Sequence, residues 1–161
     1  METVQPFLIG DGWIEMKDGD DSCRAIFHRH YSHRIYADGR RPKLFVGPGQ
    51  KCVLLRADGS AMFVWRKFKS DDGQRGVNCA VFRNEGDELA SALIREAMGL
   101  AWERWPGERF YTYIDPRKVR PTMFRGYPVW GWCFYKAGWK YDGVGKGGKI
   151  VLCADQVRTE Q

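Results

Sequence analysis

The chain has 161 residues, of which 43% are hydrophobic, and this composition predicts a single domain (1–161) with its own apolar core. No apolar run is long enough to cross a bilayer and the N-terminus lacks a signal-peptide pattern. We therefore expect a cytoplasmic protein without a membrane partner, and the formal net charge of +6 favours polyanions as partners.

The first half of the chain predicts one helix and several strands. The expected elements are, in order, a peripheral N-terminal arm (1–20), a helix (23–36) and three strands (43–46, 51–56 and 61–66). Asp21 or Ser22 is the expected cap of the helix. Asp58-Gly59 lies between the last two strands, and this dipeptide between apolar runs predicts a hairpin.

The second half predicts alternating strands and helices. The expected elements are a strand (77–82), a long helix ended by Trp105-Pro106-Gly107, a strand (109–114), a second helix (129–137) and a hairpin (139–144 and 149–153). Asp87 is the expected cap of the long helix. Its apolar face is predicted from residues at helical spacing, namely Leu89, Leu93, Ala97, Leu100 and Ala101. The strand 109–114 is expected to be central, so the fold class is α/β (α+β), with a mixed, largely antiparallel sheet flanked by helices.

Cysteines and histidines give weaker indications. The five cysteines include no Cys-x-x-Cys pair, and Cys52, Cys79 and Cys153 lie in apolar runs, which predicts buried, reduced thiols and a reducing compartment. All three histidines of the chain fall within six residues, so a metal at His28, His30 and His33 is an alternative, although no further metal-ligand motif accompanies them.

Basic residues cluster in three places, the last of which is the C-terminal hairpin with Lys136, Lys140, Lys146 and Lys149. Six lie between Arg24 and Lys43, and four lie between Arg117 and Arg125 without an acidic residue. A solubilising surface and a nucleic-acid-binding surface are both compatible with this pattern. The candidate nucleic-acid-binding residues are Arg34, Arg117, Lys118, Arg120, Arg125 and Trp130. Trp130, Trp132 and Tyr127 follow the second cluster and are read either as a base-stacking platform or as core packing, whereas Trp102 and Trp105 are read as core packing.

Four sequence elements resemble GNAT-type acyl-coenzyme A transferases, and most of all the phage Mom-type proteins that modify adenine in DNA. The elements are His30-Tyr31-Ser32-His33-Arg34, Arg83-Asn84 with Ser91 near the start of a helix, Tyr113-Ile114-Asp115-Pro116, and Gly131 to Trp139 followed by Gly143. The chain differs from the family at two positions. Glu88 ends the Arg83-x-x-Gly86-x-Glu88 loop, and Phe134 stands where the family has a tyrosine, with Tyr135 about 100° further round a helix.

The resemblance implies a GNAT-like fold, acetyl-CoA or a related acyl-CoA as cofactor, and double-stranded DNA as partner. The implied cofactor-binding residues are Val81, Phe82, Arg83, Asn84, Gly86 and Ser91. The implied catalytic residues are Asp115, Tyr31, His30 and Tyr135. Asp115 ends a strand and would orient or deprotonate the amine, but a carboxylate before proline is also common as a turn residue.

The function expected from these residues is transfer to the exocyclic amine of adenine in DNA, by acyl transfer or by the carbamoylmethylation of Mom-type proteins. The protein would act in a phage-infected or prophage-bearing bacterial cell. One alternative is a coenzyme A-dependent N-acetyltransferase acting on a small-molecule or protein amine. Another is a non-catalytic protein that binds nucleic acid or a host factor through its basic face.

Overall fold

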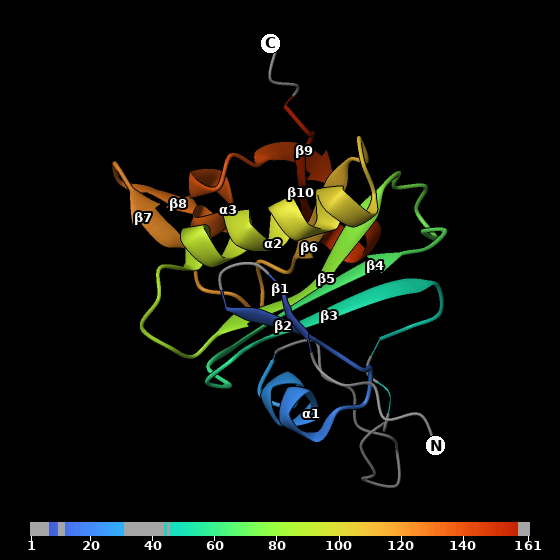
Figure 1. Ribbon diagram of the computed structural model, residues 1–161. Coiled ribbons are helices and arrows are strands. Elements are labelled where there is room, and N and C mark those ends of the chain that lie inside the picture. The colour runs from blue at the N-terminus through green and yellow to red at the C-terminus, as the bar shows by residue number, and fades with distance from the viewer. Residues whose placement is uncertain (1–6, 10–11, 31–43, 45, 158–161) are drawn as a thin grey trace, which may run out of the picture.

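An eight-stranded sheet divides the molecule into three layers, with helices α2 and α3 on one face and α1 on the other (Figure 1). The structure, a computed structural model, describes residues 7–9, 12–30, 44 and 46–157. The strand order is β1-β2-β3-β4-β5-β6-β10-β9, and β7 and β8 form a separate two-stranded sheet.

The elements have the following bounds. The strands are β1 (Phe7–Ile9), β2 (Trp13–Met16), β3 (Gln50–Arg56), β4 (Ala61–Lys67), β5 (Val77–Asn84), β6 (Phe110–Ile114), β7 (Thr122–Phe124), β8 (Tyr127–Val129), β9 (Lys140–Val144) and β10 (Ile150–Ala154). The helices are α1 (Asp21–Phe27), α2 (Ala90–Arg104) and α3 (Trp132–Lys136), and η1 (Lys146–Gly148) is a 3-10 turn. No helix within these described residues is long and apolar enough to span a membrane.

The sheet is antiparallel except where β5 lies parallel to β6. The expected mixed, largely antiparallel α+β fold is therefore confirmed. The hairpin at Asp58-Gly59 is also confirmed, because β3 and β4 pair across it and the Asp58 carboxylate accepts from the Ser60 amide at 3.0 Å. The closing hairpin is present as β9 and β10, and β6 is an interior strand with mostly buried side chains, as predicted.

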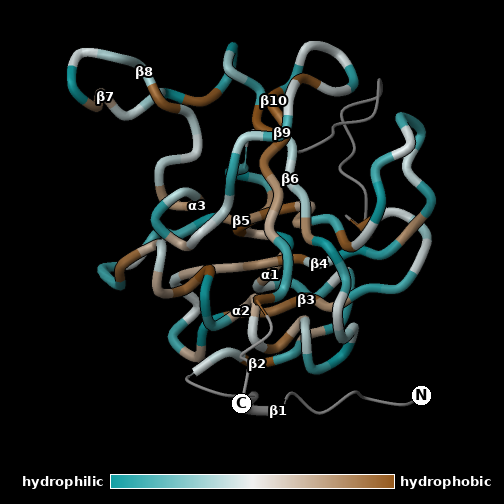
Figure 2. Tube along the Cα trace, turned by 90° about the horizontal axis from the view of Figure 1, so that it is seen from above, coloured by the Kyte–Doolittle hydropathy of each residue, from teal (hydrophilic) through white to brown (hydrophobic). Residues whose placement is uncertain are grey.

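Two apolar clusters hold the helices to the sheet. Figure 2 shows hydrophobic residues along the central strands that contribute to these clusters. Leu93, Ala97 and Ala101 of α2 are fully buried, so the predicted helical spacing is correct there. Leu89 is 63% exposed and precedes α2, which begins at Ala90, so Leu89 is the N-cap in place of the predicted Asp87. On the opposite face, α1 packs into the second cluster.

Part of the N-terminal arm predicted over 1–20 belongs to the sheet. Strand β2 pairs with β3. Trp13, the first residue of β2, is fully buried and packs edge-on against Phe63, with the two ring centroids 6.5 Å apart. The sequence pattern missed this strand because four residues are too few to display an alternation of polar and apolar side chains.

Two predicted helices are shorter in the structure. Helix α1 spans Asp21–Phe27 and is capped by Asp20, whose carboxylate accepts from the Cys23 amide at 3.1 Å, so neither predicted cap residue is correct. The remainder of the expected helix 23–36 lies mostly outside the described residues. The described residues of the expected strand 43–46 (Leu44 and Val46) belong to no strand.

The predicted helix 129–137 is also wrong over its first turn. Val129 ends strand β8, and α3 begins only at Trp132. The intervening Gly131 has φ 78°, a left-handed conformation that ends the strand and that a side chain would strain. A Cβ at Gly131 would also lie 2.3 Å from Ile114 Cδ1, so this glycine is needed for close packing of α3 on the sheet.

Candidate functional site

The parallel strands β5 and β6 run together only at their beginnings. Their ladder joins Val77–Cys79 to Phe110–Thr112, although β5 continues to Asn84 in its pairing with β4. Across the β4–β5 ladder, Val64 pairs with Val81 but Trp65 pairs with Cys79, which leaves Ala80 as one extra residue. Such a bulge bends its strand, and here it coincides with the point where β5 leaves β6. We call the resulting opening the β5–β6 wedge.

A cavity of about 250 Å³ lies in the β5–β6 wedge. Both strands contribute to its walls, and α3 closes one side with Cys133 and Phe134. Most of the lining is apolar, including Phe82 and Ile114. An apolar, concave site between diverging strands is the kind of place where proteins bind small molecules.

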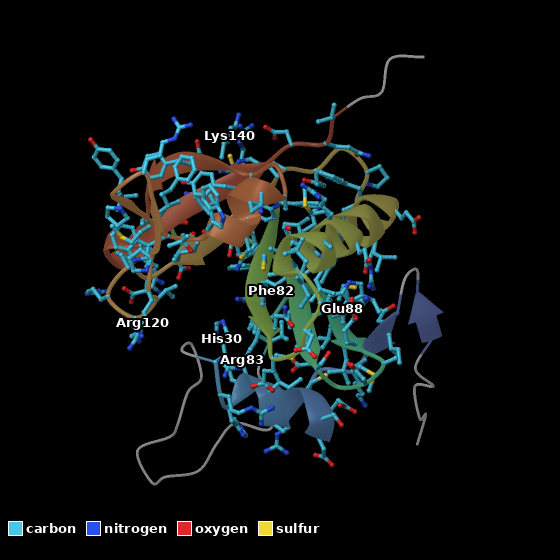
Figure 3. All side chains as sticks on the ribbon, turned by 90° about the vertical axis from the view of Figure 1, so that its left-hand side faces the viewer. His30, Phe82, Arg83, Glu88, Arg120 and Lys140 are labelled. Atoms are coloured by element: carbon cyan, nitrogen blue, oxygen red, sulfur yellow. The ribbon has the colours of Figure 1, made fainter. Side chains whose placement is uncertain are left out.

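A second, more open hollow adjoins this cavity and shares His30, Phe82, Asn84 and Val119 with it. Three basic residues complete its rim, namely Arg29, Arg83 and Lys118. We call this rim the cationic mouth. His30 and Arg83 lie near one another below Phe82 in Figure 3. The wedge therefore passes from an apolar interior to a positively charged entrance.

Glu85 joins two arginines of the cationic mouth. Its carboxylate accepts from Arg29 Nε and Nη2, each at 2.6 Å, and from Arg83 Nε at 2.7 Å. Hydrogen bonds from Arg29 and then from Arg83 lower the pKa of Glu85 to about 2. One carboxylate thus holds two guanidinium groups beside the entrance, where either could instead engage an anionic ligand.

The loop between β5 and α2 is braced by Asn84. The Asn84 side chain donates to the Glu88 carbonyl at 2.7 Å and accepts from the Gly86 amide at 3.0 Å. A Cβ at Gly86 would lie 2.7 Å from Ser60 Cβ, so this glycine lets the loop pack against the β3–β4 turn. Packing therefore explains Gly86 without reference to a phosphate.

Glu88 is engaged away from the wedge. The buried Arg56 pairs with Glu88, and also with Glu96 at 2.9 Å, while its guanidinium lies 5.2 Å from the centroid of the Trp13 ring. In Figure 3, Glu88 lies to the right of Phe82, whereas His30 and Arg83 lie below it and to the left. The carboxylate that distinguishes this loop from the family pattern is therefore neutralised by Arg56.

Asp115 is not among the residues that line the wedge. It is 2% exposed, and its carboxylate accepts from the amide, Nε and Nη2 of Arg117 at 3.0, 3.0 and 3.3 Å. The side-chain hydrogen bond from Arg117, followed by the one from its amide, lowers the pKa of Asp115. A carboxylate held ionised by a neighbouring arginine is a weak base, so the turn-residue interpretation describes Asp115 better than the catalytic one.

Other predicted residues are divided between the wedge and the core. Phe82, Arg83 and Asn84 line the wedge or its mouth, and so does His30. Val81 instead packs in the cluster beneath α1, on the opposite face from α2. Tyr31, His33 and Arg34 lie outside the described residues.

Tyr135 and Ser91 also lie away from the cavity lining. Tyr135 packs against the core, and burial raises its pKa, whereas its neighbour Phe134 faces the cavity. Ser91 is buried in the first turn of α2. On α3 it is therefore Phe134, and not the neighbouring Tyr135, that lines the cavity.

Four of the predicted nucleic-acid-binding residues, Arg117, Lys118, Arg120 and Arg125, lie on an exposed surface after β6. Lys118, Arg120 and Arg125 are exposed, while Arg117 is exposed but pairs with Asp115. Trp130 is half-buried, and its indole nitrogen donates to the Val119 carbonyl at 3.0 Å, so it anchors this loop and is not a free stacking platform.

Sequence patterns did not identify several lining residues. Thr112 and Cys133 both line the cavity, and Arg29 lies at the mouth. A threonine within a buried apolar strand is the one available indication, because a buried hydroxyl needs a partner. All five cysteines are free, with Cys52, Cys79 and Cys153 buried as expected.

Among the residues that the structure describes, which include His28 and His30, no group of three or more ligand side chains is arranged to hold a metal ion. Comparison with protein-family models, with curated proteins and with solved structures found no match to this chain.

Proposed function

We propose that the chain is a coenzyme A-dependent transferase that acylates the exocyclic amine of adenine in double-stranded DNA. The observation that carries the proposal is the separation of two parallel strands over an apolar cavity with a cationic mouth. Acyl-CoA has a slender thioester arm at one end and phosphates at the other. The wedge and its mouth match this division of polarity.

The wall formed by β5 suits the pantetheine arm. Beyond Cys79, β5 pairs with β4 on one side, and no described strand pairs with its other side. A ligand that carries amides can hydrogen-bond to such an open strand edge as an added strand does. The apolar lining, which includes Phe82 and Phe134, would bury the methylene groups of the arm.

The cationic mouth suits the phosphates. Arg29 and Arg83 already share the carboxylate of Glu85, and arginine binds phosphate oxygens with the same forked geometry. Lys118 adds a third positive charge to the same hollow. We expect the pyrophosphate to compete with Glu85 for these guanidinium groups.

His30 is the candidate general base. It is buried, and it lines both the apolar cavity and the cationic mouth. Imidazole accepts and returns protons near neutral pH. In the proposed step the adenine amine attacks the thioester carbon, a C–N bond forms and the C–S bond breaks. His30 takes the amine proton and returns it to the departing coenzyme A thiolate.

The exposed basic surface after β6 supports DNA as the acceptor. Lys118, Arg120 and Arg125 are exposed there, and such residues bind phosphates. Adenine in a duplex would have to leave the base stack to reach the wedge. The affinity for DNA should therefore fall steeply as salt is added.

Calorimetric titration with acetyl-CoA tests whether the wedge binds the cofactor. Cys133→Phe would fill the cavity, and we expect it to weaken binding at least about tenfold. Lys136→Phe is the matched control, because it places the same side chain at an exposed position of the same helix. Absence of binding to the wild-type protein would overturn the cofactor assignment.

Mass spectrometry of nucleosides tests the acceptor. DNA from cells that express the wild-type protein should contain a modified adenine nucleoside, and DNA from cells that express His30→Gln should not. The mass of the adduct would also identify the transferred group. Cofactor binding without any adenine adduct would favour an amine acceptor other than DNA.

A non-catalytic nucleic-acid-binding protein is the second candidate. Two observations favour it: Asp115 pairs with Arg117, and Phe134 lines the cavity wall. Neither residue then supplies an acid or a base to the wedge. This candidate predicts that the protein binds DNA, fails to bind acetyl-CoA and leaves adenine unmodified.

A further inference from the structure

The β7–β8 hairpin stands apart from the main sheet and projects from the body of the molecule (Figures 1 and 2). All three residues of β7 are exposed, as are Tyr127 and Pro128 of β8. Met123 is 63% exposed and Tyr127 is 74% exposed. A short strand pair with such large apolar side chains in solvent indicates a contact surface.

The tip of the hairpin carries an arginine in an unusual conformation. Arg125 and Gly126 form the two-residue turn with φ 50° and 81°, and Arg125 is the only non-glycine residue with positive φ in the described chain. Turns of this kind prefer Asn, Asp or Gly at the first position. An arginine held there against that preference points to a use for its guanidinium group.

The face of the hairpin that carries Phe124 packs against α3. Phe124 lies against Trp132 of α3 with ring centroids 4.9 Å apart, and Arg125 lies over the Phe124 ring at 5.2 Å. Met123 pairs with Pro128, one position from the Phe124–Tyr127 pair. Because side chains alternate across a ribbon, Met123 and Pro128 occupy the face opposite Phe124, away from Trp132.

The charge of this region is entirely positive. Residues 116–141 contain no acidic residue, and their basic residues are Arg117, Lys118, Arg120, Arg125, Lys136 and Lys140. A polyanion therefore complements the surface around the hairpin. The major groove of B-DNA is wide enough to admit a two-stranded ribbon, and the exocyclic amine of adenine faces that groove.

We propose that the β7–β8 hairpin enters the major groove of duplex DNA beside the target adenine. Arg125 contacts the DNA at the tip, and Met123 packs against apolar base edges such as the thymine methyl group. This inference rests on the proposed DNA acceptor, and it adds the element that engages the duplex.

Fluorescence anisotropy with a labelled duplex at several salt concentrations tests this assignment. Arg125→Asn suits the turn but removes the charge, so we expect about tenfold weaker binding and a salt slope smaller by about one. Lys17→Asn is the matched control, since Lys17 is exposed and follows β2 near the other edge of the sheet. Met123→Gln should weaken binding without changing the salt slope, because it removes no charge.

Competition with groove-binding dyes locates the hairpin on the DNA. Methyl green, which occupies the major groove, should displace the protein, and the minor-groove ligand distamycin should not. Equal duplex affinity for Arg125→Asn and Lys17→Asn would overturn the inference, as would a preference for single strands or displacement by distamycin alone. Hairpin-dependent duplex binding without acetyl-CoA binding would overturn the transferase proposal and support the hairpin inference.

Discussion

The hydroxyl of Thr112 donates a hydrogen bond of 3.0 Å to the backbone carbonyl of Cys79, and both residues are buried. These two residues also form the last pair of the β5–β6 ladder. The bond therefore joins the two strands at the point where they begin to separate. At the closed end of the β5–β6 wedge, the strands are therefore joined by a side-chain hydrogen bond as well as by the backbone ladder.

Replacing Thr112 with valine should destabilise the fold. Thr112→Val keeps the shape of the side chain but removes the donor to a buried carbonyl, which costs about 1–3 kcal/mol in the free energy of unfolding. Urea unfolding measures this cost. Thr122→Val, on the exposed strand β7, is the control and should change stability by less than about 0.5 kcal/mol. Equal effects of the two variants would contradict the structural role of the bond.

A pair of leucines in and before α2 tests where the helix begins. Leu93 is fully buried, so Leu93→Ala should cost about 2–5 kcal/mol in the free energy of unfolding. Leu89 is 63% exposed, and Leu89→Ala should be nearly neutral. Thermal and urea unfolding of both variants would show the difference. A large loss for Leu89→Ala would mean that the helix starts earlier and buries this residue.

Glu85 should make the stability of the protein depend on acid pH. Hydrogen bonds from Arg29 and Arg83 lower its pKa in the folded state from 4.5 to about 2. Its contribution is therefore present above pH 4.5 and is lost as the pH falls through about 2.

Urea midpoints measured at several values of pH test the contribution of Glu85. Glu85→Gln should flatten the decline in stability between pH 4.5 and 2, whereas Glu103→Gln, at an exposed position of α2, should leave the decline unchanged. An unaltered pH profile in Glu85→Gln would rule out this ion-pair contribution.

Two substitutions separate the candidate bases. If His30 takes the proton, His30→Gln should lower kcat by at least about a hundredfold, since general bases contribute factors of that size. Asp115→Asn should lower kcat by less than about tenfold, because Asp115 contacts Arg117 and does not line the cavity. Steady-state rates with a DNA acceptor measure both. Loss of kcat in Asp115→Asn with an unchanged rate in His30→Gln would reverse the assignment.

Local patterns predicted the parts of the fold that depend on near neighbours. The Asp58-Gly59 hairpin follows from turn chemistry, and the buried face of α2 from residues four apart such as Leu93 and Ala97. The patterns failed where a distant contact decides the local structure. Gly131 lies between β8 and α3 with φ 78°, and a Cβ there would lie 2.3 Å from Ile114 Cδ1, so the helix expected from Val129 begins only at Trp132.

Local patterns likewise predicted only part of the candidate site. The sequence placed Phe82 at the end of a strand and Arg83 and Asn84 in the loop before a helix, because strand and helix periodicity are properties of neighbouring residues. The structure extends that strand, β5, to Asn84. Whether Asp115 would face a cleft or pair with Arg117 could not be read from spacing, since both arrangements satisfy the same turn. The wedge itself depends on the bulge at Ala80 and on the pairing of β5 with two different neighbours. Contacts among strands far apart in the chain decide such geometry, and only the folded structure brings those strands together.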